Sequence, residues 1–196
     1  MIATAPLTQK FSFEQYLAYC DGHETPHELV EGDLIPMTVG TGKHGSIIRF
    51  LWLQFEQASA ASGNPWVTLP GLVGIRSPRG RRWETSRIPD VAVLPKAQWE
   101  EMANRSAVID FHETPPLLVV EVVSPSTRTD DYRSKRSEYA LLQIPEYWIV
   151  DPLAGKVTIG LEQAQLYDLT EYEGEDLIQS PTFPTLTLTA QQILTA

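Results

Sequence analysis

The sequence has little that would tie it to an oxidising compartment or to a membrane. Its one cysteine, Cys20, can form neither an intrachain disulfide nor a cysteine cluster for zinc. No apolar run is long enough for a transmembrane helix. The N-terminal residues MIATAPLTQKFSFEQYL lack the basic start and apolar stretch of a secretory signal. We therefore expect a cytoplasmic protein with no membrane partner.

Basic charge is also scarce, because 15 Lys and Arg residues stand against 25 Asp and Glu and give a net charge of -10. Such a balance argues against nucleic-acid binding, which depends on neutralising phosphates with cations. However, most of the basic residues fall in two short stretches: Arg76, Arg79, Arg81, Arg82 and Arg87, then Arg128, Arg133, Lys135 and Arg136. These stretches favour either a basic stripe on an acidic body or merely solvated charged turns.

The length of 196 residues and the hydrophobic content of 42% fit a single domain spanning residues 1–196. Ser12 and Gln15 have the spacing of a capping box, which predicts a short helix ending near Asp21. Residues 27–37 alternate like a strand. Residues 43–61 carry apolar side chains at helical spacing and predict a long helix.

The middle of the chain changes to short apolar runs. Residues 65–75 and 87–95 predict antiparallel strands, and residues 96–106 a short helix. The nearly continuous apolar run PPLLVVEVV at 115–123 predicts a central strand covered on both faces. A helix over 129–143 and a strand over 146–152 then complete a βαβ unit with parallel strands.

The predicted fold is therefore an α/β (α+β) domain with an αβββαβ core and a mixed sheet. An extra helix and strand precede this core. An antiparallel meander that includes residues 156–170 and 182–189 follows it, with a short terminal helix.

One motif is rejected. Residues 23–27 read HETPH and match the HExxH signature of zinc metallopeptidases. That chemistry needs both histidines on one helix face, and Pro26 disrupts a helix there. We interpret the segment as a connector that leads into a strand.

Two carboxylates stand out for their surroundings. Glu121 interrupts the most apolar strand of the sequence, where its charge needs a cation or hydrogen-bond donors. Asp90 precedes another apolar strand, which the meander places near Glu121. Two carboxylates and the backbone carbonyl of Val122 would suit Mg²⁺ or Mn²⁺. The alternatives are a buried salt bridge of Glu121 with Lys135 or Arg133, and a turn capped by Asp90.

These residues also carry a family resemblance. Glu31-Gly32, His44-Gly45, Pro89-Asp90 and above all the block from Pro115 to Pro152 resemble the Uma-two family of endonucleases. The similarity extends over nearly the whole chain. It implies membership of the PD-(D/E)XK superfamily, a restriction-endonuclease-like core and metal-dependent cleavage of DNA phosphodiester bonds.

The resemblance also implies site residues. The superfamily lysine is expected two positions after Glu121, but Val123 stands there, and Lys135 in the following helix is the substitute that the resemblance suggests. Lys135 lies four residues beyond Asp131, on the same helix face, so the alternative is a surface ion pair between these two residues. Glu28 and His44 match family positions and become catalytic candidates beside Asp90, Glu121 and Lys135. Tyr139, Trp148 and Asp151 match as well, and we expect packing or strand-end roles for them.

The partners follow from the same interpretation. We expect DNA backbone contacts from the basic clusters, namely Arg79, Arg81, Arg82, Arg128, Arg133 and Arg136. Many enzymes of the superfamily act as homodimers. Because of Val123, the alternative is a nuclease-fold protein that binds nucleic acid or a protein without cutting. The sequence leaves open whether the substrate is duplex DNA, single-stranded DNA or RNA.

Overall fold

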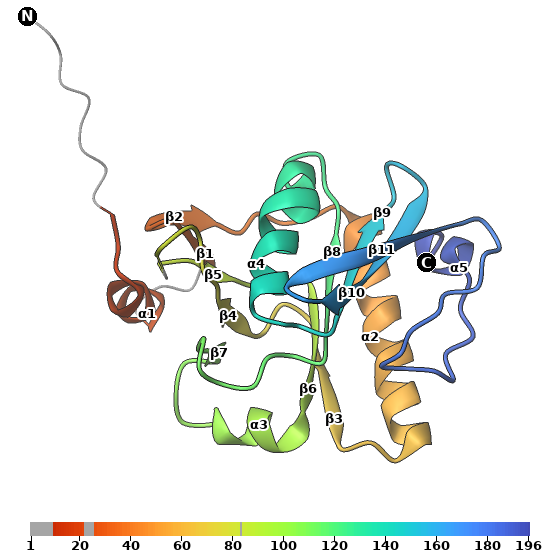
Figure 1. The fold of residues 1–196 in the computed structure, drawn as a ribbon, viewed down its shortest axis with the longest axis horizontal. Coiled ribbons are helices and arrows are strands. Elements are labelled where there is room, and N and C mark those ends of the chain that lie inside the picture. The colour runs from red at the N-terminus through yellow and green to blue at the C-terminus, as the bar shows by residue number, and fades with distance from the viewer. Residues whose placement is uncertain (1–9, 22–25, 83) are drawn as a thin grey trace, which may run out of the picture.

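The computed structural model describes residues 10–21, 26–82 and 84–196. The helices are α1 (Phe13–Asp21), α2 (Gly42–Ser62), α3 (Lys96–Glu101), the π-helical segment η1 (Asp130–Lys135), α4 (Arg136–Leu141) and α5 (Ala190–Leu194). The strands are β1 (His27–Val30), β2 (Asp33–Pro36), β3 (Trp66–Leu69), β4 (Gly74–Arg76), β5 (Ser86–Arg87), β6 (Val91–Pro95), β7 (Val108–Ile109), β8 (Leu118–Val122), β9 (Glu146–Asp151), β10 (Lys156–Gln163) and β11 (Leu166–Glu173). In Figure 1, α2 and α4 flank β8 on opposite sides.

The strands form two mixed sheets. The larger has the order β11-β10-β9-β8-β6-β3, and the smaller has the order β2-β1-β5-β4-β7. In the larger sheet β8 and β9 run parallel, joined by η1 and α4, whereas β8 and β6 run antiparallel. The predicted mixed α/β fold, its central strand and its βαβ unit are thus confirmed.

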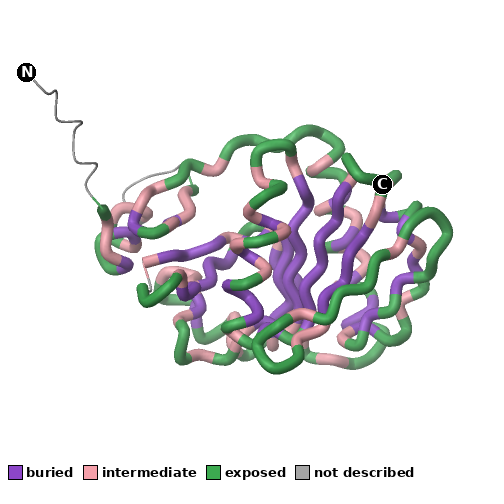
Figure 2. Tube along the Cα trace, turned by 45° about the horizontal axis from the view of Figure 1, so that its top comes forward, coloured by how far each residue is buried: buried purple, intermediate pink, exposed green. Residues whose placement is uncertain are grey.

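The central strands β6, β8 and β9 of the larger sheet are buried on both faces and run side by side through the middle of the molecule (Figure 2), whereas the edge strand β11 is mostly exposed. Side chains alternate between the faces along each strand. Val120 and Val122 pack with α2 and α5 in one core cluster. Val119 and Val123 pack on the opposite face with Tyr139 of α4. Glu121 lies between Val119 and Val123 in the strand, so its side chain lies on the face covered by η1 and α4.

The N-terminal prediction needs one correction. The capping box is present, because the Ser12 N–H donates to Gln15 Oε1 at 2.8 Å and the Gln15 N–H donates to Ser12 Oγ at 3.3 Å. However, residues 27–37 form the hairpin β1–β2 and not one strand. The chain reverses at Glu31 and Gly32, whose φ angles are 52° and 84°. Alternation of apolar and polar residues alone does not distinguish a strand from a tight hairpin. Most of the rejected HETPH segment lies outside the described residues, and His27 begins β1.

The antiparallel strands predicted over residues 65–75 and 87–95 are confirmed, since β3 pairs with β6 and β4 pairs with β5. The two pairs lie in different sheets, and Pro70 and Gly71, with φ 59° at the glycine, end β3 before β4 begins. The strand predicted over residues 182–189 was wrong, because these residues form no strand and only an isolated bridge joins Leu177 to Thr189. Pro184 cannot donate a ladder hydrogen bond in this segment.

The helix predicted over 129–143 is present, but it opens as a π-helix over Asp130–Lys135 and becomes α-helical only in α4. Such wide turns are rare and occur often at functional sites. The terminal helix is confirmed as α5, with a capping box between Thr189 and Gln192. Among the described residues, no helix is both long and apolar enough to cross a membrane.

Candidate active site

The centre of the candidate site is a buried ion pair between Lys135 of η1 and Glu121 of β8. Lys135 Nζ donates to Glu121 Oε2 at 2.7 Å, and the Tyr139 hydroxyl donates to Glu121 Oε1 at 2.7 Å. Lys135 Nζ also lies 3.1 Å from Asp131 Oδ1. Neither Asp131 carboxylate oxygen, both buried, makes a hydrogen bond of regular geometry with the described residues. The buried charge of Glu121 is therefore compensated by the Lys135 ammonium and by the hydroxyl of Tyr139.

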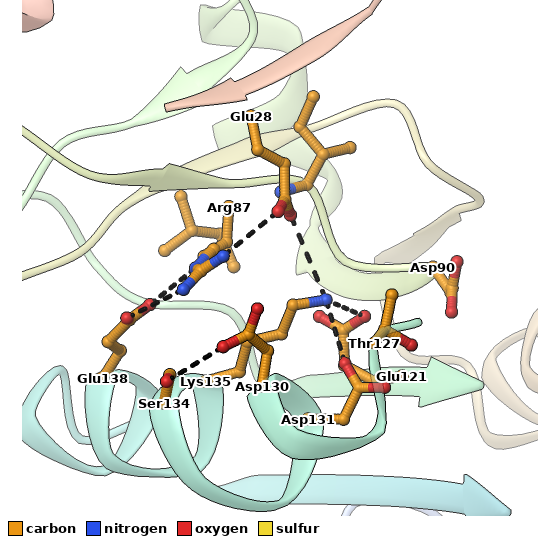
Figure 3. Close-up of polar contacts among 12 residues, drawn as sticks. Glu28, Arg87, Asp90, Glu121, Thr127, Asp130, Asp131, Ser134, Lys135 and Glu138 are labelled. Carbon is orange, nitrogen blue, oxygen red and sulfur yellow. Dashed lines mark hydrogen bonds and ion pairs between the residues drawn. The ribbon is translucent and has the colours of Figure 1, made fainter. Parts of the chain in front are cut away.

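The local structure explains how Lys135 reaches a strand. Asp131 and Lys135 are both buried and face the sheet from η1, while Arg133 between them is exposed. Figure 3 shows the Lys135 side chain extending from this helix toward the carboxylates of Glu121, Asp131 and Glu28. The helix thus brings an ammonium group to the face of β8 that carries Glu121.

Glu28 reaches the same cluster from the smaller sheet. Its Oε1 accepts the backbone N–H of Ile88 at 3.0 Å and lies 4.0 Å from Lys135 Nζ. Its Oε2 accepts from Arg87 Nη1 at 3.2 Å. Arg87 also binds Glu138 of α4 in bidentate fashion, with distances of 2.8 Å and 3.1 Å. Arg87 is only 1% exposed, so this pair ties β5 to α4 behind the site.

Asp90 and His44 form the other end of the site. Asp90 Oδ2 accepts the Val122 N–H at 2.7 Å, which fixes the carboxylate against the end of β8. His44, in the first turn of α2, places Nε2 3.1 Å from the carbonyl oxygen of Val122 and 3.3 Å from Asp90 Oδ2. His44 Nε2 therefore lies against both the Asp90 carboxylate and the Val122 carbonyl.

The electrostatics of the cluster are dominated by negative charge. Three carboxylates, those of Glu28, Glu121 and Asp131, lie within 4.0 Å of the Lys135 ammonium. A fourth, that of Asp90, is close enough to Glu121 to act on its charge, and Arg87 is paired with Glu138 and Glu28. Burial raises the pKa of Glu121 well above its usual value, Lys135 opposes that rise, and the other three carboxylates add to it. Burial likewise raises the pKa of Asp131, against the effect of Lys135.

The pKa values of the two basic groups are raised as well, but here neighbouring negative charge raises them and burial opposes the rise. Burial disfavours the Lys135 ammonium, but Glu121, Glu28 and Asp131 outweigh this and raise its pKa. The pKa of His44 is raised, first by its hydrogen bond with Asp90 and further by the Asp90 charge, while burial opposes the rise. A site with this excess of carboxylates is suited to a cation.

The donor set fits a hard divalent cation in its chemistry. Asp90 Oδ2 and the Val122 carbonyl are oxygen donors beside each other, and Glu121 retains free lone pairs after accepting two hydrogen bonds. Within the described ranges, no group of three or more His, Cys, Asp or Glu side chains is arranged to hold a metal. A metal here would therefore depend on the backbone carbonyl as well as on side chains.

The arginines predicted to contact DNA differ in their environments. Arg81, Arg82 and Arg133 are exposed. Arg79 pairs with Glu31 at 3.1 Å, and Arg128 Nε lies 3.5 Å from the buried Asp151. Arg136 is half-buried at the start of α4.

Two other arginines of the first basic stretch are not available for the DNA backbone. Arg87 is buried in its pair with Glu138, and Arg76 binds Asp110 at 3.3 Å while its guanidinium lies over the rings of Phe13 and Phe111. Sequence clustering alone does not show which side chains of a basic stretch point inward.

The sequence interpretation missed three members of the cluster as site residues. Asp131 was noted only for its spacing to Lys135, Tyr139 only as a packing residue, and Glu138 not at all. Glu138 lies three positions after Lys135 and seven after Asp131, and this helical spacing is a signal that it shares their buried face. The predicted packing and strand-end roles agree with the structure for Trp148, a core residue, and for Asp151, which accepts the N–H groups of Leu153 and Ala154.

A solved structure of similar fold was found by comparison with known proteins. A crystal structure described as "a putative nuclease belonging to DUF820 from Anabaena variabilis ATCC 29413" matches with a TM-score of 0.74 and 16% sequence identity, covering 94% of this chain and 98% of that chain. At this identity the match shows that the two proteins share a fold. No curated protein matches the chain.

The family is shown by the sequence. The model of the Uma2 family, described as "Putative restriction endonuclease", matches residues 13–191. The protein belongs to the Uma2 family. The resemblance inferred from Pro115 to Pro152 is thereby confirmed.

Proposed function

We propose that this protein is a divalent-metal-dependent endonuclease that hydrolyses DNA phosphodiester bonds at the site formed by Asp90, Glu121 and Lys135. The observation that carries the proposal is the excess of partly and fully buried carboxylates around a single ammonium, at the ends of β6 and β8. Such an arrangement is costly for a purely structural cluster, and a bound cation relieves it. The family and the nuclease fold support the same reaction class.

The residues that would hold the cation are Asp90, Glu121 and the carbonyl of Val122. When bound, a divalent cation supplies Lewis-acid polarisation of the phosphodiester and lowers the pKa of a water molecule. Mg²⁺ and Mn²⁺ both suit such oxygen donors.

Lys135 supplies positive charge beside this centre. Its ammonium has three donors, of which one binds Glu121 and another faces Asp131 at 3.1 Å. The remaining donor can orient the attacking water or offset negative charge that develops on the phosphate in the transition state. Glu28, anchored by Arg87 and by the N–H of Ile88, adds a second attractive charge on the side of Lys135 that faces the smaller sheet.

The exposed arginines would bind the DNA backbone around the site. Arg81 and Arg82 lie between β4 and β5, and Arg133 and Arg136 lie on η1 and α4. None of these contacts reads bases, so the proposal assigns no sequence specificity.

The test is a cleavage assay on duplex DNA, single-stranded DNA and RNA with Mg²⁺ or Mn²⁺. Asp90→Asn and Glu121→Gln keep the side-chain shapes, and we expect each to lower the rate by about 10²-fold or more, the scale of several kcal/mol of transition-state stabilisation. Asp168→Asn is the matched control, because Asp168 is exposed on β11. Cleavage that survives Asp90→Asn would refute the proposed site.

One observation favours a second candidate, a nuclease-fold protein that binds without cutting. Val123 occupies the strand position of the superfamily lysine, and both Glu121 oxygens already accept hydrogen bonds from Lys135 and Tyr139. Calorimetry with Mn²⁺ separates the two candidates, since a site closed by these bonds would bind no metal in the millimolar range.

A further inference from the structure

We propose that His44 Nε2 is a ligand of the metal centre and that this nitrogen makes the site prefer Mn²⁺ over Mg²⁺. The inference rests on the proposed function, because it assigns a ligand and a metal class to the same centre. It concerns the end of the site at Asp90 and Val122, away from the Lys135 ammonium.

The first argument is the spacing of the donor atoms. His44 Nε2 lies 3.1 Å from the Val122 carbonyl oxygen and 3.3 Å from Asp90 Oδ2. Neighbouring ligands of an octahedral cation with bonds of about 2.1 Å lie roughly 3.0 Å apart, which is the bond length multiplied by the square root of two. The nitrogen is thus separated from each of the two oxygens by about the distance between adjacent ligands of one coordination shell.

The second argument is that the chain holds the ring in this position. The Thr41 side chain caps α2 by accepting the His44 N–H at 3.2 Å. Gly40 packs next to the ring itself, because a Cβ added to Gly40 would lie 2.7 Å from His44 Nδ1. The glycine therefore leaves the space that the imidazole occupies, and the cap fixes the backbone from which the ring projects.

The third argument concerns charge and ligand type. The cluster already has four carboxylates, so a neutral imidazole adds a donor without adding negative charge. Imidazole suits first-row transition metals, whereas Mg²⁺ prefers oxygen ligands and retained water. A set of one nitrogen, one carbonyl and carboxylate oxygens therefore favours Mn²⁺.

A simple hydrogen-bonding role for His44 makes the opposite prediction. If the ring only fills the space between Asp90 and the Val122 carbonyl, it competes with the cation, and its removal should strengthen metal binding. If the ring is a ligand, its removal should weaken binding of Mn²⁺ in particular. The sign of the change in affinity distinguishes the two roles.

The experiment is calorimetric titration of the full chain with Mn²⁺ and with Mg²⁺. We expect the unsubstituted protein to bind Mn²⁺ at least roughly 10-fold more tightly than Mg²⁺, and His44→Ala to lose most of that difference. Gly40→Ala should shift in the same direction, since its methyl group displaces the ring. His112→Ala is the matched control, because the His112 side chain is 69% exposed in a distant loop and should leave both affinities unchanged.

A spectroscopic readout makes the test independent of affinity. Electron spin-echo spectroscopy of bound Mn²⁺ should show coupling to a ¹⁴N nucleus that disappears in His44→Ala and persists in His112→Ala. Absence of this coupling in the unsubstituted protein, or Mn²⁺ binding that is unchanged or tighter in His44→Ala, would overturn the inference. If Asp90→Asn still abolishes binding in that case, the proposed function stands. A protein that binds neither metal would overturn both.

Discussion

The Lys135 ammonium lies 2.7 Å from the Glu121 carboxylate, although 14 positions separate the two residues and they belong to a helix and a strand. A lysine two positions after Glu121 would lie on the same face of β8, because side chains of a strand alternate with a period of two. Instead, Lys135 belongs to η1, which packs against that face of β8 and places the ammonium beside Glu121. A lysine therefore lies beside Glu121, but it comes from the following helix and not from the strand itself.

Removing only the lysine should destabilise the protein. Lys135→Met leaves Glu121 and Asp131 buried without their cation, and the loss of one partner from a buried pair costs about 3–5 kcal/mol. The double variant Glu121→Gln/Lys135→Met removes much of the unpaired charge and should recover part of this loss in urea unfolding. Both variants should be inactive in the cleavage assay. Cleavage by the double variant would contradict a catalytic role for the pair.

A lysine at position 123 should partly replace Lys135. Val123 is buried on the same face of the sheet as Glu121. We expect Val123→Lys/Lys135→Met to cleave at least roughly 10-fold faster than Lys135→Met, because a charged donor near Glu121 restores more than 1.4 kcal/mol of transition-state stabilisation. Val123→Met/Lys135→Met controls for the change in side-chain size. Equal rates for these two double variants would show that the ammonium cannot act from the strand.

The pair of Arg87 and Glu138 should be structural. Both side chains are buried, and the bidentate geometry cannot be reproduced by lysine. We expect Glu138→Ala to lower the free energy of unfolding by about 3–5 kcal/mol, and Arg87→Lys to destabilise as well. Glu175→Ala, at an exposed position, should change it little. Denaturant unfolding measures these differences, and a Glu138→Ala protein as stable as the control would be incompatible with the prediction.

The exposed arginines should determine how DNA binding depends on salt. Each lost phosphate contact reduces the slope of log K against log salt by about 0.9. Arg81→Gln/Arg82→Gln and Arg133→Gln/Arg136→Gln should each flatten the slope by roughly 2. Arg105→Gln is the control, since Arg105 binds Glu113. A slope that none of the substitutions alters would remove these arginines from the DNA interface.

Alkaline stability should depend on Tyr132. Burial, and then the nearby Asp151, raises the pKa of Tyr132 from 10 to about 12, so the fold favours the neutral phenol. The stabilising contribution is present below pH 10, the unfolded-state value, and is lost as the pH rises through about 12. Tyr132→Phe removes the hydrogen bond to Asp151 and should make the loss of stability over this pH range shallower. Unfolding midpoints measured from pH 8 to 12 test this, and parallel curves for the two proteins would contradict it.

Much of the fold could be predicted from local patterns. The apolar run at 118–122 and the periodic apolar residues of α2 determine which segments are buried, whatever their neighbours are. The hairpin at Glu31-Gly32 and the division of residues 65–95 between two sheets could not be predicted in the same way. Strand pairing depends on partners far along the chain, and apolar alternation is the same for either pairing.

The candidate site, like the fold, has features that the sequence alone could predict and features that depend on tertiary contacts. The sequence by itself determined that Glu121 needs a compensating charge, because a carboxylate in an apolar strand is costly to bury without one. Only the tertiary structure decided which groups provide it, namely Lys135 from η1 and Tyr139 from α4. It also decided that His44 lies against both the Val122 carbonyl and Asp90, which accepts the Val122 N–H. Such contacts arise when elements pack against each other, and distances between elements are not encoded in the spacing of residues along the chain.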